Sequence, residues 1–306
     1  QFSVQKTDGK GDLLIKKRAR KYTAFVVVLI LLFCLFSFLM IYPVYYVLIG
    51  SFNEGMDYLS GGIYLFPRKF TAANYYVVFE DAKLWQAYFI TVSRTVLGTA
   101  IALWFTATVA YAMSRKELPF KNFFYFLNIF TMFFSGGLIP FFLIINLLGL
   151  YDTYWLYLIP CMYSVYHMII IANYFRALPE ELREAAVLDG AGEWRLLYTI
   201  AIPLSTPVIA TVGLWTAIGH WNSYFDSMVY TQSESLTTLQ YYLMQMINSK
   251  NIDLGGVTLP DNVAENITAE VITFASIMVS ILPVMFIFPF LTRFFEKGIM
   301  IGSLKG

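Results

Sequence analysis

The segment from Glu184 to Pro203, EAAVLDGAGEWRLLYTIAIP, is the part of the chain whose residue types and spacing point most directly to a task. It places four charged side chains and two glycines in a chain that is 58% apolar. Because charge at the centre of a bilayer is costly, this segment must lie at a surface. Its paired alanines would let the backbone of another protein approach closely. The chemistry that it indicates is therefore docking rather than catalysis.

A short helix must position these residues. Pro179 stands where a first helical residue is expected, Glu180 and Glu181 fill the first turn at the positive end of the helix dipole, and Gly190 stands where a helix would stop. We therefore predict a surface helix over about 179–189, closed by Gly190. One face of this helix is shared by Leu182, Ala185, Ala186 and Asp189. Beyond the glycine, the side chains expected to pack under the rest of the protein are Trp194, Leu197 and Ile200.

Motifs for catalytic chemistry are absent from the sequence. It contains no G-x-x-x-x-G-K-[ST] phosphate-binding loop and no HExxH, and its His and Cys residues are not clustered at metal-ligand spacing. We therefore predict that the chain is not an enzyme, holds no cofactor or metal of its own and takes its energy from a partner. Cys34 and Cys161 lie in apolar runs, where a thiol is an ordinary packing residue, and we assign them no function.

Composition places the chain among all-α polytopic membrane proteins. Only 13% of its 306 residues are charged, and its mean hydropathy is +0.62. The net charge of +1 gives no support to a nucleic-acid partner. Six candidate spans, each near the length that a helix needs to cross a bilayer, run roughly over 23–50, 86–113, 122–149, 152–173, 205–230 and 271–295. Gly136, Gly137 and Pro140 interrupt the third, which predicts either a broken helix that lines a cavity or a simple kink.

The distribution of Lys and Arg predicts the orientation. With both termini in the cytoplasm, sixteen of the 21 basic residues fall on the inner side and four on the outer side, while Arg94 lies within the second span. This bias agrees with the positive-inside rule. It places the N-terminal tail 1–21, the helix at 179–190 and the C-terminal tail 298–306 in the cytoplasm, with the six-span domain over 22–297. We predict a multi-pass protein of a bacterial cell membrane, embedded in the lipid bilayer.

The longer outer segment, 231–270, contains an amphipathic pattern. In LTTLQYYLMQMI, apolar residues recur at helical spacing, at Leu239, Tyr242, Leu243 and Met246. A helix with this pattern would either rest on the membrane or meet a partner. The GGVTLPDN that follows predicts an exposed loop.

The segment at 184–203 resembles the EAA motif of bacterial ATP-binding-cassette (ABC) importer permeases. Glu-Ala-Ala is followed after three residues by Gly190, after nine more by Ile200, and then by Pro203. The resemblance implies the type I ABC importer permease (MetI-like) fold with six transmembrane helices. In that fold this helix is the coupling helix, which docks into a cleft on an ATPase subunit. The contact would be carried by Glu184, Ala185, Ala186 and Gly190, with Leu182 and Trp194 beside them.

Three further stretches resemble the carbohydrate-uptake branch of these permeases, the MalG/LplC-like group. They are AYAMSRKELPFKN at 110–122, GHWNSYFDSMVY at 219–230 and the C-terminal EKGIMIGSLKG. The likeness implies oligosaccharide import with a homologous second permease, two ATPase subunits that bind ATP and Mg, and an extracytoplasmic sugar-binding protein. The loop 231–270 would reach into that binding protein. The C-terminal tail would touch the ATPases through Gly302, Ser303 and Lys305.

Ionisable side chains are rare within the predicted spans away from the inner rim. Among them are Arg94, His220 and Asp226, and their scarcity argues against an ion-coupled carrier. His220, Trp221 and Asn222 either border the translocation path, where Trp would stack on a sugar and Asn would bond hydroxyls, or serve interhelical packing. Arg94 either lines the path or pairs with another subunit. It occupies a region where many family members have no charge, which weakens analogies to maltose permeases.

Two other functions are compatible with the sequence. A stand-alone channel or secondary carrier would use the helix at 179–190 only as a cytoplasmic cap and would transport without an ATPase. An ABC importer for peptides, amino acids or ions would share the EAA motif but would lack the MalG-like tail.

Overall fold

The computed structural model describes residues 9–62, 65–248 and 266–303. Side chains are described for residues 25–62, 65–248 and 266–287. The described chain is a series of helices, and its only β-type pairing is an isolated bridge between Asn53 and Phe70. The elements that form the body are α1 (Gly9–Ser51), α4 (Ala82–Ser114), α5 (Lys121–Phe133), α6 (Leu138–Leu147), α7 (Val165–Arg176), α11 (Thr206–Asn222) and α15 (Ala269–Ser303).

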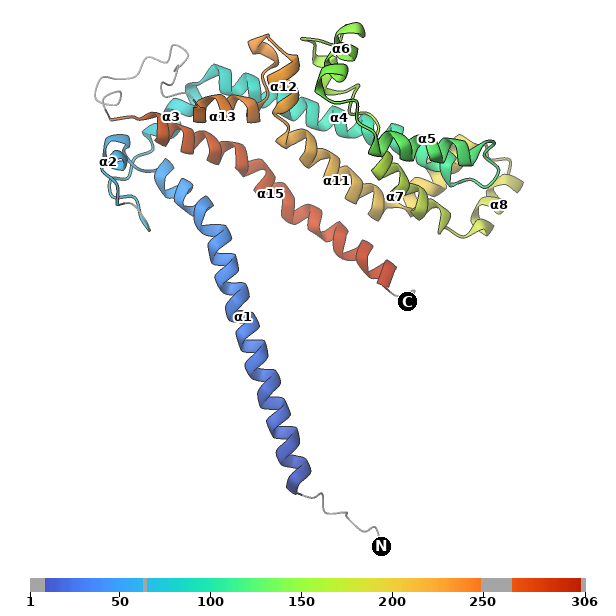
Figure 1. Ribbon diagram of the computed structural model, residues 1–306, viewed down its shortest axis with the longest axis horizontal. Helices are drawn as coiled ribbons and strands as arrows, with labels where there is room; N and C mark the ends of the chain where they lie inside the picture. The colour runs from blue at the N-terminus through green and yellow to red at the C-terminus, as the bar shows by residue number, and fades with distance from the viewer. Residues whose placement is uncertain (1–8, 63–64, 249–265, 304–306) are drawn as a thin grey trace.

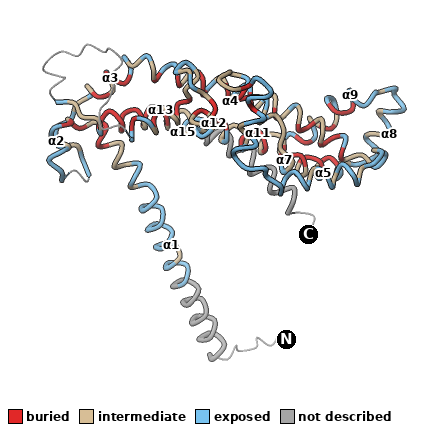
Figure 2. Tube along the Cα trace, turned by 45° about the horizontal axis from the view of Figure 1, so that its top comes forward, coloured by how far each residue is buried: buried red, intermediate tan, exposed pale blue. Residues whose placement is uncertain are grey.

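The long helix α4 is the centre of the body. Its N-cap is Asp81, whose carboxylate accepts hydrogen bonds from the amides of Lys83 and Leu84 and so satisfies two free donors of the first turn. Helices α7 and α11 pack against it, as does the short helix α13 (Leu239–Asn248). Buried residues therefore follow α4, α7, α11 and α15 through the body (Figure 2).

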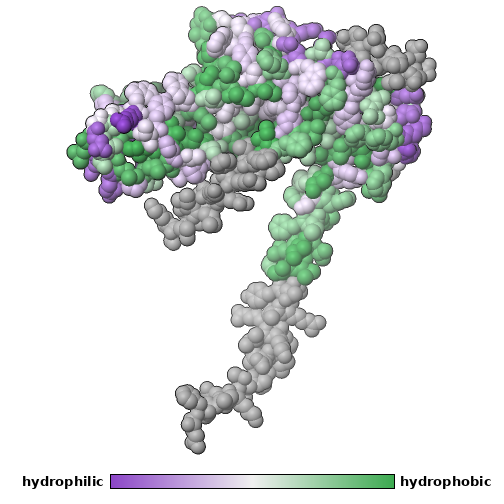
Figure 3. Space-filling view, turned by 180° about the vertical axis from the view of Figure 1, so that it is seen from behind, coloured by the Kyte–Doolittle hydropathy of each residue, from purple (hydrophilic) through white to green (hydrophobic). Residues whose placement is uncertain are grey.

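Helix α1 leaves this body, and its described contacts with the body lie near its C-terminal end, mainly with α15 and also with α2 (Gly55–Leu59) and α3 (Ala73–Glu80) (Figure 1). The close approach there depends on Gly50, because a Cβ at that position would lie 2.7 Å from Cδ2 of Phe274. From Phe25 onward the rest of α1 presents large apolar side chains, such as Phe33 at 67% exposure. On the face shown in Figure 3, strongly hydrophilic residues gather at the two ends of the body, and large apolar patches lie between them. This distribution is typical of a bundle surrounded by lipid.

The predicted third span is a broken helix. Helices α5 and α6 are separated by residues 134–137 and meet at an angle of 115°. Gly137 lies at the break with a φ of +88°, a backbone conformation that residues with a Cβ rarely adopt. Of the two alternatives that the glycines left open, the structure therefore shows the break and not the simple kink.

The prediction of a continuous fourth span over 152–173 is wrong. The segment contains a short 3₁₀ helix, η1 (Tyr154–Tyr157), then turns, and only then the twelve-residue helix α7. Pro160 lies between them and has no amide hydrogen to continue a helix. Ser164 starts α7 afresh, because its hydroxyl accepts a hydrogen bond from the amide of His167.

The sequence predicts six spans, and the described helices provide between three and five candidates. Three of them are long and apolar enough to cross a bilayer, and two bent helix pairs bring the total to five if each pair is one span. The ends also differ from the predicted limits. Helix α1 already begins at Gly9, and α15 continues to Ser303, so Gly302 and Ser303 belong to a helix, while Lys305 lies outside the described residues.

The amphipathic segment at 239–246 forms helix α13, and its apolar face is turned inward. Leu239, Leu243 and Met246 are buried in a cluster with residues of α3 (Ala73–Glu80), α11 and α15. The helix therefore covers the end of the bundle, a location that neither predicted alternative named. The remaining short elements at this end are α2 (Gly55–Leu59), α12 (Phe225–Tyr230) and η3 (Glu234–Leu236).

Candidate functional site: a surface helix and a cavity between spans

The predicted surface helix is present as α8 (Glu180–Leu188), at the end of the body opposite α2 and α3 (Figure 1). Pro179 occupies the position before its first residue, and Glu180 and Glu181 fill the first turn. The helix closes with a Schellman turn: Gly190, with φ of +80°, donates its amide to the carbonyl of Val187, and Ala191 donates to that of Ala186. The local start and stop residues thus determine the helix, as predicted.

The predicted small-residue face of α8 is divided between the body and the outside. Ala186 is half-buried and packs against the cluster formed by α4, α7 and the segment after α8. Glu184 and Ala185 are exposed, and so are Leu182 at 44% and Leu188 at 88%. One side of α8 therefore packs against the body. The other side exposes an alanine, two leucines and a carboxylate on the surface of the chain.

The segment after α8 connects it firmly to α11. It comprises α9 (Glu193–Leu196), a π-helical turn, η2 (Leu197–Ala201), and α10 (Ile202–Leu204), and this stretch meets α11 at 85°. Leu196, Leu197 and Ala201 are buried, and Ile200 packs against the same cluster. Movement of α8 would therefore be passed to α11 through a packed connection.

Trp194 does not pack under the body, contrary to the prediction. It is 60% exposed and stacks on Tyr198, with ring centroids 6.2 Å apart. Tyr198 is tied to α4, because its hydroxyl accepts a hydrogen bond of 2.6 Å from the indole of Trp104. The buried place that the sequence assigned to Trp194 belongs to Leu196.

Polar contacts fix α8 against the turn between α4 and α5. Arg183 forms ion pairs with Glu180 at 3.0 Å, with Glu117 at 3.6 Å and with Glu193 at 3.6 Å. Glu193 also accepts a hydrogen bond of 2.6 Å from the hydroxyl of Tyr111 on α4. The network joins α8, α9, α4 and the α4–α5 turn through one guanidinium.

The predicted path residues Arg94 and His220 line one cavity of about 230 Å³ between α4, α7 and α11. The ring of His220 lies against α4 at Gly98, where a Cβ would lie 2.6 Å from Nε2, so this packing requires a glycine. Trp215, which is 41% exposed, stands at the cavity beside His167 and Tyr166, with ring centroids 6.1 and 6.5 Å away. Further polar lining comes from Ser164, Thr216 and Ser223.

Arg94 is paired within its own chain. It is 1% exposed, and its guanidinium meets the carboxylate of Asp226 in a bidentate pair, at 3.1 Å from Nη1 and 2.5 Å from Nη2. The ring of Tyr157 lies 4.4 Å from the guanidinium carbon, and Nε has no hydrogen-bond partner. The pairing of Asp226 with Arg94 was not predicted.

Trp221 and Asn222 do not join this cavity. Trp221 is buried against Tyr88 and the apolar residues of α13 and α15. Together with Asn222, it borders a separate hollow between α11, α13 and α15. The four predicted path residues therefore divide into two pairs on opposite sides of α11.

Asp152 connects the loop after α6 to the segment that follows α12. Its carboxylate accepts hydrogen bonds from the amides of Gln232 and Ser233, both at 2.9 Å, and from the Ser233 hydroxyl at 2.6 Å. These bonds, the one from the Ser233 hydroxyl foremost, hold the pKa of Asp152 below its usual range. Its φ of +52° is a conformation that Asp and Asn tolerate better than most residues.

We expect Asp152→Asn to loosen the start of the segment 231–248. Asparagine tolerates the same backbone conformation but removes the charge, so amide hydrogen exchange at Gln232 and Ser233 should become roughly tenfold faster. In the wild type the protection should persist above the ordinary Asp pKa of about 3.9 and be lost as pH falls through the lower folded-state pKa. Unchanged exchange in the variant would show that the carboxylate does not hold these loops together.

Comparison with known proteins identifies the family. Residues 13–301 match the model of the binding-protein-dependent transport system inner membrane component. The chain belongs to this family. Protein LplC of Bacillus subtilis (strain 168) is 38% identical over 267 residues, which are 87% of this chain and 90% of that protein. The polygalacturonan/rhamnogalacturonan transport system permease protein YtcP of the same strain is 31% identical, over 89% of this chain and 95% of that protein.

A solved structure supports the same assignment for the permease. The crystal structure of a bacterial ABC transporter involved in the import of the acidic polysaccharide alginate contains a chain with 32% identity and a TM-score of 0.83. The match covers 90% of the permease and 98% of that chain. The predicted family, an inner-membrane ABC importer permease with an all-α fold, is therefore confirmed.

Proposed function

We propose that the permease is one of two membrane subunits of an ATP-driven importer for oligosaccharides. The observation that carries the proposal is the anchored but uncovered helix α8, which stands at the EAA position in a chain 38% identical to LplC and 32% identical to an alginate importer chain. The other partners would be two ATPase subunits, which bind ATP and Mg, and an extracytoplasmic sugar-binding protein. The chain itself would perform no catalysis and hold no cofactor, and both termini would lie in the cytoplasm.

The contact with the ATPase would be made by the exposed side of α8. Glu184, Ala185, Leu182 and Leu188 form its surface, and Gly190 determines the angle at which the helix ends. Closure of the ATPase dimer would push α8. The packed connection from Leu196 to Ala201 would then transmit this movement to α11, which lines the cavity with Arg94. Alternating access would follow from the swing of α11 against α4.

The translocation path would include the cavity of Arg94 and His220. Trp215 and the neighbouring rings of Tyr166 and His167 offer an aromatic surface for a sugar face, while Ser164 and Thr216 offer hydroxyls for hydrogen bonds. The cavity opens between α4, α7 and α11, and the second permease would close it there. We assign Trp221 to packing, because apolar residues surround it.

The proposed function is tested by transport in reconstituted vesicles. The permease is co-expressed with its neighbouring transporter genes, and uptake of oligosaccharides derived from alginate and from polygalacturonan is measured in vesicles with and without the ATPase subunits. We expect uptake only with ATPase, ATP and binding protein together. Uptake without the ATPase would overturn the proposal in favour of an autonomous carrier. ATP-driven uptake of peptides or amino acids in place of oligosaccharides would contradict the proposed substrate class.

A further inference from the structure

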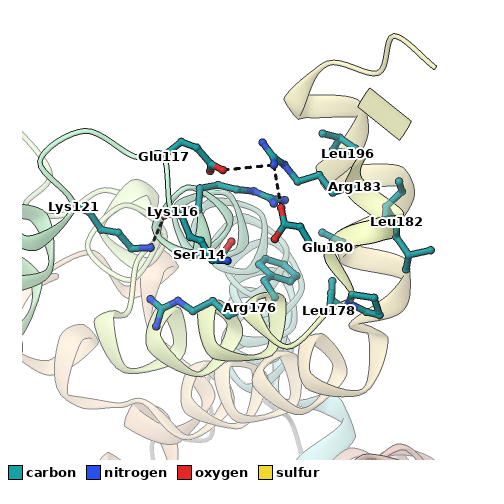
Figure 4. A pocket seen from close by; sticks show the side chains of 15 residues that line it. Ser114, Lys116, Glu117, Lys121, Arg176, Leu178, Glu180, Leu182, Arg183 and Leu196 are labelled. Atoms are coloured by element: carbon teal, nitrogen blue, oxygen red, sulfur yellow. Dashed lines mark hydrogen bonds and ion pairs between the residues drawn. The ribbon is translucent and has the colours of Figure 1, made fainter. Parts of the chain in front are cut away.

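A second cavity, of about 170 Å³, lies behind α8, between that helix, the end of α7 and the turn that joins α4 to α5 (Figure 4). Its lining contains an excess of positive charge. Five cationic side chains border it, against the two carboxylates of Glu117 and Glu180. The cationic residues are Arg115, Lys116, Lys121, Arg176 and Arg183.

One of the five cations accounts for both carboxylates. Arg183 forms the ion pairs with Glu117 and Glu180, and Figure 4 shows these two contacts on one side of the cavity. In the part of the chain with described side chains, none of the ion pairs includes any of the other four cations. The lining therefore carries a net positive charge, because two carboxylates face five cations.

Three of these four cations contact neutral groups of the protein. The guanidinium of Arg115 lies over the ring of Tyr111, 4.1 Å from its centroid, and its buried Nε has no hydrogen-bond partner. Arg176 lies over Tyr125 and donates a hydrogen bond of 3.2 Å to the carbonyl of Met113. Lys121 donates to the carbonyl of Arg115. Ordered cations that converge on one space repel each other, so an anion in that space would be stabilised.

The floor of the cavity is apolar. Phe175, Leu178, Leu196 and Ile200 form it. Beside it, the start of α5 exposes further aromatic side chains, including Phe123 at 60%. The space is smaller than the roughly 300–1,000 Å³ of a typical small-molecule site, so it suits a phosphate group better than a whole metabolite. A basic rim over apolar surface at the end of a membrane bundle is the environment in which anionic lipid head groups bind.

We propose that this cavity binds the phosphate group of an anionic phospholipid, with the lipid chains lying along α5. The phosphate would bridge Arg115 and Lys116 on the α4–α5 turn to Arg176 at the end of α7. It would thereby hold together the α4–α5 turn and the end of α7, against which α8 packs. The proposal rests on the permease alone and does not depend on which solute is transported.

The test compares lipid binding in matched charge-neutralising variants. The full-length permease is purified in the assembly that it forms, and binding of phosphatidylglycerol and phosphatidylcholine is titrated by native mass spectrometry. Arg115→Gln removes a cation inside the cavity. Lys116→Gln does the same for an exposed side chain and so carries little risk for folding. Arg195→Gln is the control, because Arg195 is exposed at the same end of the molecule and does not line the cavity.

We expect Arg115→Gln and Lys116→Gln each to weaken phosphatidylglycerol binding by about tenfold, because each removes a charge-assisted hydrogen bond to the phosphate. Binding of phosphatidylcholine to any variant, and of phosphatidylglycerol to Arg195→Gln, should stay at the wild-type level. Equal binding by cavity and control variants would overturn the proposal. A second experiment measures the thermal stability of delipidated protein with and without inorganic phosphate. If phosphate stabilises the wild type but not Arg115→Gln, and the protein shows no preference between the two lipids, the site binds soluble phosphate and the lipid proposal is refuted.

Discussion

Gly190→Val is expected to abolish oligosaccharide uptake while the protein remains in the membrane. Gly190 has a φ of +80°, and a β-branched residue in this conformation costs about 1–3 kcal/mol. No atom lies within 4 Å of a Cβ at this position, so the effect comes from the backbone and not from a clash. The chain can relieve the strain only by opening the turn that sets α8 at its angle. Uptake in whole cells and retention of the ATPase on purification measure the result.

Gly192→Ala is the matched control for this variant. Gly192 lies two residues further along, its φ is −76°, and a Cβ there also meets open space. Alanine fits this conformation, so uptake and ATPase retention should equal those of the wild type. Gly190→Asn should fall between the two, because Asn tolerates positive φ better than Val. If Gly190→Val transports as well as Gly192→Ala, the angle of α8 does not matter for coupling.

The bounds of α8 could be predicted because its start and stop signals are local. Pro179, the two glutamates that follow it and Gly190 each act through the backbone of their own turn, so no distant contact is needed to place the helix. The break of the third predicted span has the same origin, in a glycine that adopts positive φ. The family could be recognised for a related reason, since the EAA motif is a continuous segment.

The burial of single side chains after α8 could not be predicted in the same way. Leu197 and Ile200 pack inward as predicted, and Leu196 and Ala201 are buried beside them. These four residues follow ordinary helical spacing, and the same stripe continues back to Glu193, whose carboxylate accepts a hydrogen bond from Tyr111. Trp194 is one residue off this stripe and lies outside on Tyr198, a small difference in helix phase that apolar character alone did not reveal.

Apolar composition predicts compatibility with lipid but not the continuity of a helix. The run over 152–173 contains enough apolar residues for a span, yet Pro160 and the cap at Ser164 divide it. Arg94 and Asp226 illustrate a different limit. They are 132 positions apart, so only the packing of the fold brings them together. With Arg94 alone in view, a partner in another subunit was an equally reasonable expectation.

Asp226→Ala is expected to destabilise the permease strongly. Its carboxylate is the bidentate partner of a guanidinium that is 1% exposed, and Arg94 would be left as a buried charge with only the ring of Tyr157 beside it. Removal of one partner from a buried pair typically costs about 3–5 kcal/mol. The midpoint of thermal unfolding, measured on protein reconstituted in nanodiscs, should fall by several degrees, and the yield of folded protein should fall with it.

Two further variants separate the buried charge from a general effect of mutation. Arg94→Met combined with Asp226→Leu removes both charges, and because no uncompensated ion remains, the unfolding midpoint should return to near the wild-type value. Lys69→Ala breaks the pair with Glu54, whose N–O distance of 3.2 Å is similar but whose lysine side chain is 60% exposed. Water solvates the glutamate left behind, so the cost should stay below about 1 kcal/mol. A double variant as unstable as Asp226→Ala would contradict this explanation. The destabilisation would then come from the lost hydrogen bonds of the Asp226 carboxylate with Ser223 and the Ser227 amide, and not from the unpaired charge of Arg94.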